Sequence, residues 1–239
     1  MKARQVKKLD PERPLGENAA RIVQVRLEEL LSFTPKALER PEIEAQHDMR
    51  IAAKRLRYVL ELTGFCFGRP ADTARRRARD LQDILGEMHD CDEMLPRVLE
   101  HLEELRASDA EAVRRKAGDT PDLDPRLAAT APHRTTYRGL DVLAVYLQAR
   151  RQVLFDRFLA FWARQEETGT WVRLERSVDT YLRKARDARR AAKEAERAKE
   201  ELAEMERARE QAATRAEQAE QERQRARKAV SRRPARRPS

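Results

Sequence analysis

The chain has 239 residues, enough for one large helical domain or two small ones. Charged residues make up 39% of it, aromatic residues 5%, and only 7 positions are glycine, which disfavours a β-sandwich and favours long helices. The formal net charge is +9, but residues 1–182 are nearly balanced with 32 Lys and Arg against 31 Asp and Glu, so an anion site there needs clustered charges.

No apolar run approaches the ~20 residues that cross a bilayer, and the first residues lack the apolar segment of a signal peptide. We therefore expect a cytoplasmic protein. The two cysteines, Cys66 and Cys91, fit reduced thiols in that compartment, and no CxxC pair indicates a zinc site.

The chain up to residue 106 reads as successive amphipathic helices. The first covers residues 17–33, and the second begins at Pro41 and ends at Gly64. A third is predicted over residues 71–89. Asp90 is then expected to cap a fourth helix that continues to about residue 106, with Pro96 near its start.

Residues 107–132, rich in Gly, Pro and Asp, are predicted to form the longest loop of this part of the chain. A long helix is expected over residues 133–167, and a final helix begins at Trp171. The sequence thus predicts an all-α antiparallel bundle of long helices over residues 15–182, preceded by a polar segment, 1–14.

The composition changes after Leu182. Residues 183–226 contain no Gly, Pro or aromatic residue and carry acid–base pairs three residues apart, which favours a long charged helix. Its heptad positions are small and interrupted by arginine, so it is either a solvated single helix or a weak coiled coil. Residues 227–239 contain six basic residues and no acid, and we expect a disordered basic tail.

A row of cations on the second helix is the sharpest chemical signal. His47, Arg50, Lys54 and Arg57 are three or four residues apart, so they share one stripe that is roughly 15 Å long. That length suits an extended polyanion better than one phosphate. The simpler interpretation is a solvated helix face, in which Glu61 pairs with Arg57.

The third helix repeats this pattern. Arg75 and Arg79 share a face with Gln82, Arg76 lies beside them, and Gly86 on that side lets another helix approach closely. Two antiparallel helices with these stripes would form a basic groove, in which guanidinium groups bind phosphate oxygens in pairs.

The strings HDMRIAAKRLRYVLEL, residues 47–62, and LQDILGEMHD, residues 81–90, resemble the CHAD domain, the conserved histidine α-helical domain. The resemblance covers about residues 15–182 and implies a helical bundle that binds inorganic polyphosphate in a basic groove. It implies ligand roles for His47, Arg50, Lys54, Arg55 and Arg57, with contributions from Arg75, Arg76 and Arg79.

The second half of the chain departs from the family pattern, because residues 133–138 lack a second basic helix motif. Arg138, Arg150, Arg151 and Arg157 are secondary candidates for lining the groove. Arg151 shares a face with Phe155 and Phe158, so it also fits a residue at the edge of the core.

Two other functions compete with polyphosphate binding. His47, His89-Asp90 and Asp141 resemble the pattern of HD-type metal-dependent phosphohydrolases, but the cations around His47 repel a metal. The basic tail fits nonspecific nucleic-acid binding, although no aromatic residue in it would stack on bases.

The sequence favours a polyphosphate-binding protein that is not an enzyme, with no metal or cofactor. Attachment to polyphosphate granules is the expected role, and the C-terminal helix is expected to contact a protein partner. Because a protonated imidazole adds charge to the stripe, we expect affinity to rise toward pH 6.

Overall fold

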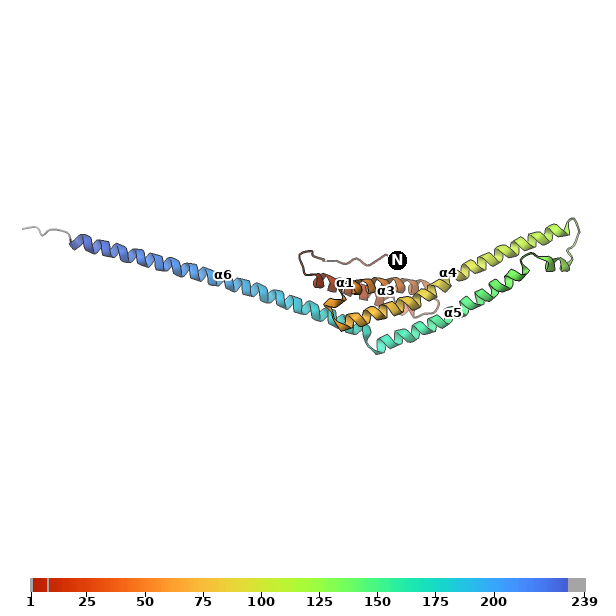
Figure 1. The fold of residues 1–239 in the computed structure, drawn as a ribbon, viewed down its shortest axis with the longest axis horizontal. Coiled ribbons are helices and arrows are strands. Elements are labelled where there is room, and N and C mark those ends of the chain that lie inside the picture. Colours follow the sequence, from red (N-terminus) through yellow and green to blue (C-terminus); the bar gives the residue numbers. More distant parts are fainter. Residues whose placement is uncertain (1, 8, 232–239) are drawn as a thin grey trace, which may run out of the picture. The chain divides into compact units, whose positions relative to one another are not determined.

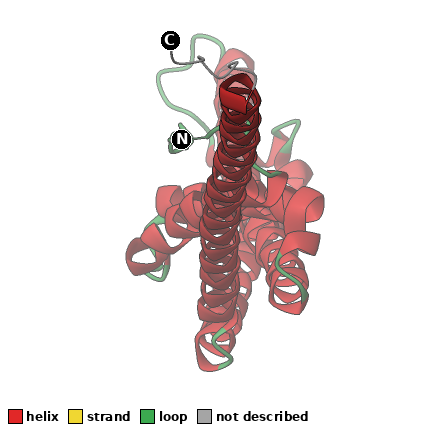
Figure 2. Cartoon of the chain, turned by 90° about the vertical axis from the view of Figure 1, so that its left-hand side faces the viewer, coloured by secondary structure: helices red, strands yellow, loops and turns green. Residues whose placement is uncertain are grey.

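The computed structural model describes residues 2–7 and 9–231, and this part of the chain consists of helices and loops without a strand (Figure 2). The predicted all-α class is confirmed. The chain divides into two compact units, residues 1–182 and 183–239, at the point where the composition becomes basic. No helix among the described residues is long and apolar enough to cross a membrane.

Unit 1 is built on three neighbouring contacts: α1 packs on α3, α3 on α4, and α4 on α5 (Figure 1). The helix predicted from Pro41 begins at Ile43, and its end at Gly64 is as predicted. The elements are α1 (Leu15–Ser32), α2 (Thr34–Ala37), α3 (Ile43–Thr63), the 3-10 turn η1 (Gly64–Cys66), α4 (Arg69–Ala117), the 3-10 helix η2 (Pro125–Thr130), α5 (Arg134–Glu167) and α6 (Thr170–Ser231).

The predicted helix break at Asp90 is wrong, because α4 runs without interruption for 49 residues. Its buried positions continue through this point at spacings of three, four and seven, so packing overrides the local capping signal. Pro96 lies inside the helix on an exposed face. The buried residues that carry the continuous stripe are Leu81, Leu85, Met88, Cys91, Val98 and Leu102.

The loop predicted over residues 107–132 is also wrong in extent, since α4 continues to Ala117 and η2 occupies much of the remainder. The buried carboxylate of Asp109 accepts hydrogen bonds from the backbone N–H of His133 at 3.1 Å and from the hydroxyl of Tyr137. These bonds tie the start of α5 to α4 and close the α4–α5 hairpin.

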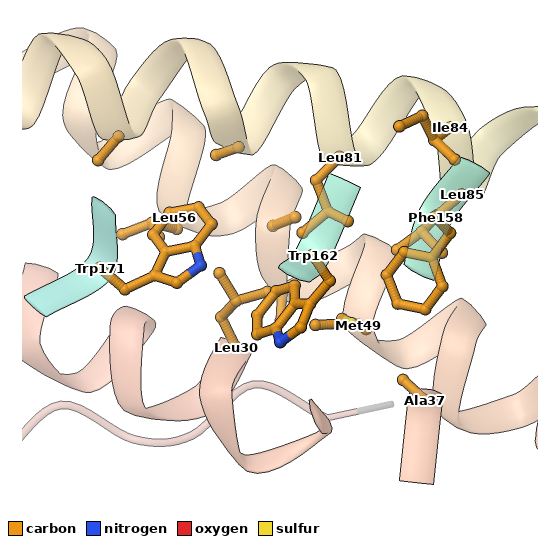
Figure 3. Close-up of a cluster of buried hydrophobic side chains, with 14 of the residues drawn as sticks. Leu30, Ala37, Met49, Leu56, Leu81, Ile84, Leu85, Phe158, Trp162 and Trp171 are labelled. Carbon is orange, nitrogen blue, oxygen red and sulfur yellow. The ribbon is translucent and has the colours of Figure 1, made fainter. Parts of the chain in front are cut away.

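The core of unit 1 gathers side chains from α1, α3, α4, α5 and the first turns of α6 (Figure 3). Trp162 and Trp171 stack with ring centroids 6.1 Å apart across the turn between α5 and α6. The Ser177 hydroxyl donates to the Phe67 carbonyl at 2.6 Å, which fixes the start of α6 against η1.

Unit 2 contains the remainder of α6, which has exposed charged residues along residues 186–201. The helix continues to Ser231 and therefore extends into the segment 227–239 that the sequence predicted as a disordered tail. Residues 232–239 of that predicted tail lie outside the described residues.

Candidate functional site

The cationic stripe of α3 lies at one edge of the helix, beside its buried face. Met49, Ala53 and Leu56 are buried in the core, which fixes the rotation of α3 about its axis. Within that rotation, His47, Arg50 and Arg57 are half-buried and Lys54 is exposed. The four side chains therefore line a border between the core and solvent.

A contact between two histidines aligns α3 with α4. The Nδ1 atoms of His47 and His89 are 3.3 Å apart, and their ring centroids are 4.6 Å apart. The two helices run antiparallel, so moving forward along α3 means moving backward along α4 (Figure 1). Arg50 is thereby brought level with Gly86, and Lys54 with Gln82.

We call this border the seam. Its α3 members are His47, Arg50, Lys54 and Arg57. Its α4 members, at the same alternating spacing, are Arg75, Arg79, Gln82, Gly86 and His89.

Two arginines of the seam have buried donors that make no hydrogen bond. The Nε atoms of Arg50 and Arg57, and Oε1 of Gln82, are buried and have no hydrogen-bond partner among the described residues. Buried polar groups are normally bonded, so an unfilled donor marks a place where a ligand or water fits. A Cβ added to Gly86 would meet no atom within 4 Å, so space remains beside Arg50.

The ion pairs along the seam are few and long. Arg57 Nε lies 3.5 Å from Glu61 Oε1, and Arg79 Nε lies 3.9 Å from Asp83 Oδ2. The guanidinium of Arg57 also lies 4.8 Å from the centre of the Tyr58 ring. Both carboxylates are exposed and both pairs are long, so they contribute little and an anion could replace them at small cost.

The environment of His47 disfavours its protonated form. Burial lowers the pKa of this imidazole below its ordinary value, and the positive potential of His89 and Arg50 lowers it further, whereas Asp48 acts in the opposite direction. Nδ1 of one histidine must donate to the other, so at neutral pH the pair can share one hydrogen bond. An anion in the seam would favour the charged form.

Arg55 is placed away from the seam, about 140° around α3 from Arg50. Its Nη1 donates at 2.9 Å to Glu29 of α1, a fully buried carboxylate that also accepts from Arg26 and from the Arg4 backbone N–H at 3.2 Å. The resemblance implied a ligand role for Arg55, but its guanidinium holds α3 to α1.

The basic residues of α4 lie on two different faces of the helix. Arg75 is half-buried on the seam, and Arg79 is exposed beside it. Arg76 is exposed and lies about 100° around the helix from Arg75, toward the outer face of α4. Arg75 and Arg79 therefore extend the row formed by the α3 cations, and Arg76 flanks it.

The secondary candidates on α5 lie on the other side of α4, where carboxylates meet most of them. Arg150 Nη2 is 2.6 Å from Glu87, and Arg157 Nη1 is 3.8 Å from the same carboxylate. Arg151 Nε donates to Asp92 at 3.0 Å. Arg138 is exposed on the α4–α5 hairpin. None of the four is brought to the seam.

Sequence reasoning missed the role of His89, which it considered only as a metal ligand. The signal was available, because His89 follows Gly86 by three residues on the same face of α4. Asp141, the third member of the HD-type pattern, lies 3.5 Å from Arg106 instead. The described residues contain no group of three or more His, Cys, Asp or Glu placed to hold a metal.

Comparison with protein-family models matches residues 2–99 to the CHAD domain. The match covers α1, α3 and the first part of α4, and so contains every residue of the seam. Comparisons with curated proteins and with solved structures found no match.

Proposed function

From the match of residues 2–99 to the CHAD domain and from the seam together, we propose that this chain binds inorganic polyphosphate. CHAD domains occur in polyphosphate-related proteins in general. The seam supplies the chemistry that such a ligand needs: a row of fixed cations on two adjacent helices, with guanidinium groups that bind phosphate oxygens in pairs.

The proposal rests on two buried arginine N–H donors that make no hydrogen bond. Arg50 and Arg57 each hold a buried Nε that makes no hydrogen bond in the described chain, and they lie seven residues apart on the same stripe. The Nε of Arg57 has only a long ion pair, 3.5 Å from Glu61. An anion that accepts from both must extend over seven residues, roughly 10 Å of helix. A chain of linked phosphates meets that requirement, whereas one phosphate does not.

The mechanism is capture by a preformed row of charges. Because the core fixes α3 and α4, binding requires little rearrangement, and the bound chain releases counterions from its phosphates. Affinity therefore falls with salt. A bare phosphate chain also lies closer to two helices than a duplex can, which favours polyphosphate over DNA.

In the proposed role, the chain binds polyphosphate and catalyses no reaction on it. The charged helix of unit 2 would connect the captured polymer to a protein partner, which is a means of attaching the protein to polyphosphate granules. The basic residues of 227–239 are the alternative source of polyanion binding, and the experiment below separates the two.

The test compares the full chain with the triple variant Arg50→Met, Lys54→Met, Arg57→Met against long-chain polyphosphate and a DNA duplex over a salt series. If each lost contact contributes about 0.7 kcal/mol, polyphosphate affinity falls about thirty-fold. The matched control removes three exposed cations elsewhere in unit 1, Arg164, Arg173 and Arg176, and should retain affinity. Equal binding by the triple variant and wild type would refute the seam as the site.

A further inference from the structure

An apolar stripe on α5 faces solvent. Val142, Tyr146 and Val153 are 62%, 56% and 67% exposed, and exposed Ala149 completes a run at spacings of four, three and four. The stripe is about 16 Å long and lies opposite the face that packs on α4, where Ala144, Leu147, Leu154 and Phe158 are buried. Val145, 64% exposed, lies along its edge.

We propose that a second copy of this chain covers the stripe, with the two α5 helices packed antiparallel about a two-fold axis. Contiguous apolar surface on a helix otherwise rich in charge marks an interaction site. A two-fold contact requires a surface that complements itself.

The sizes along the stripe are self-complementary. With the axis between residues 147 and 148, Val142 faces Val153 of the second copy, and Tyr146 faces Ala149. Each pairing occurs twice. The small Ala149 leaves room for the large Tyr146 ring, so the two helices can approach to the 8–10 Å typical of packed helices.

The charges at the ends of the stripe are complementary as well. Arg138 and Asp156 lie at the same side of the stripe, and the antiparallel alignment places Arg138 of one copy level with Asp156 of the other. Arg138 is exposed, and the side chain of Asp156, which accepts from Arg40 at 2.7 Å, is 66% exposed. Arg157 is directed toward Glu87, 3.8 Å away, which limits its repulsion of Arg138.

A contact of three helical turns is smaller than the about 1,200 Å² of a standard stable interface. We therefore expect a dimer that forms and dissociates with protein concentration. The contact uses α5 alone and leaves the seam open, so it is independent of polyphosphate binding.

Cross-linking tests the alignment directly. In the full-length double variant Val142→Cys, Val153→Cys, a short bismaleimide should join residue 142 of one copy to residue 153 of the other. The single variants are matched controls, because like positions are about 16 Å apart in the dimer; they also report any reaction of Cys66. No covalent dimer in the double variant, or equal yields in the single variants, would overturn the alignment.

Sedimentation equilibrium on the full chain tests the dimer itself. Wild type should show concentration-dependent dimers, and Val153→Glu should raise the dimer dissociation constant by at least about tenfold, since a charge would be buried twice. Leu62→Glu, at an apolar position of α3 that is 75% exposed, should leave it unchanged. A monomer at every concentration, or a dimer that Val153→Glu does not weaken, would refute the proposal.

Discussion

Replacing Arg55 and Arg50 separately by methionine should divide stability from binding. Arg55 donates to the fully buried carboxylate of Glu29, and its side chain is 25% exposed. A hydrogen bond to a charged group contributes about 1.5–3 kcal/mol, so Arg55→Met should lower the free energy of unfolding by about 2 kcal/mol. For unit 1, residues 1–182, this loss of stability lowers Tm by roughly 4–8 °C.

Arg50→Met should have the opposite effect, because the buried Nε of Arg50 has no partner to lose. We expect its free energy of unfolding to change by less than about 0.5 kcal/mol while polyphosphate affinity falls. The assay is tryptophan fluorescence during thermal unfolding. Both tryptophans, Trp162 and Trp171, lie in the core of unit 1, so the signal excludes unit 2.

The reasoning would be refuted if Arg55→Met kept the wild-type Tm and lost polyphosphate affinity as Arg50→Met does. Arg55 would then be a ligand, and its bond to Glu29 would contribute nothing to the fold. Affinity is measured at a temperature where both variants are folded, so that partial unfolding of Arg55→Met does not resemble a loss of ligand contacts.

Three other perturbations follow from the same contacts. Gly86→Ala adds a Cβ into open space within a helix, so urea titrations should show a free energy of unfolding that is higher by about 0.5–1 kcal/mol. Gly86→Gln places a longer side chain in the seam and should weaken polyphosphate binding. Gly16→Ala places a Cβ against the hydroxyl of Tyr181, whose ring must then leave its edge contact with Phe67. The urea midpoint should therefore fall by an amount equivalent to about 1–3 kcal/mol. Because the folded state lowers the pKa of His47, the unfolded chain binds the proton more readily as pH falls. Without ligand, the free energy of unfolding should therefore decrease as pH drops below about 6.5, whereas polyphosphate affinity should rise. If wild type and His47→Gln showed the same pH dependence of stability and of affinity, this prediction would be contradicted.

The ends of helices are predicted well where a helix-breaking residue, such as glycine, coincides with the end of the periodic apolar pattern. Gly64 ends α3 as expected, and the long helix predicted over 133–167 agrees with α5 within one residue. At Asp90 the two signals conflict. A capping pattern favours a break, but the buried stripe from Leu85 through Cys91 to Val98 continues, and packing along 49 residues prevails.

The candidate site could be predicted only one helix at a time. Spacing places His47, Arg50, Lys54 and Arg57 on one stripe, yet it does not say which helix lies beside that stripe or at what alignment. The contact between His47 and His89 supplies both. The pairing of Arg55 with Glu29 spans 26 residues and two helices, so no local pattern could reveal it.

The basic motif of α3 is best understood as one helix serving three neighbours. Met49 and Leu56 face the core, Arg55 faces Glu29 on α1, and Lys54 faces the seam with α4. Lys54 and Arg55 are adjacent in sequence but about 100° apart around the helix, which is why equal charges perform different tasks. Exchanging them would place a lysine beside Glu29, and its ammonium is a point charge without the planar set of donors that a guanidinium offers to a buried carboxylate. The motif is therefore specific in spacing for a structural reason as well as for ligand binding.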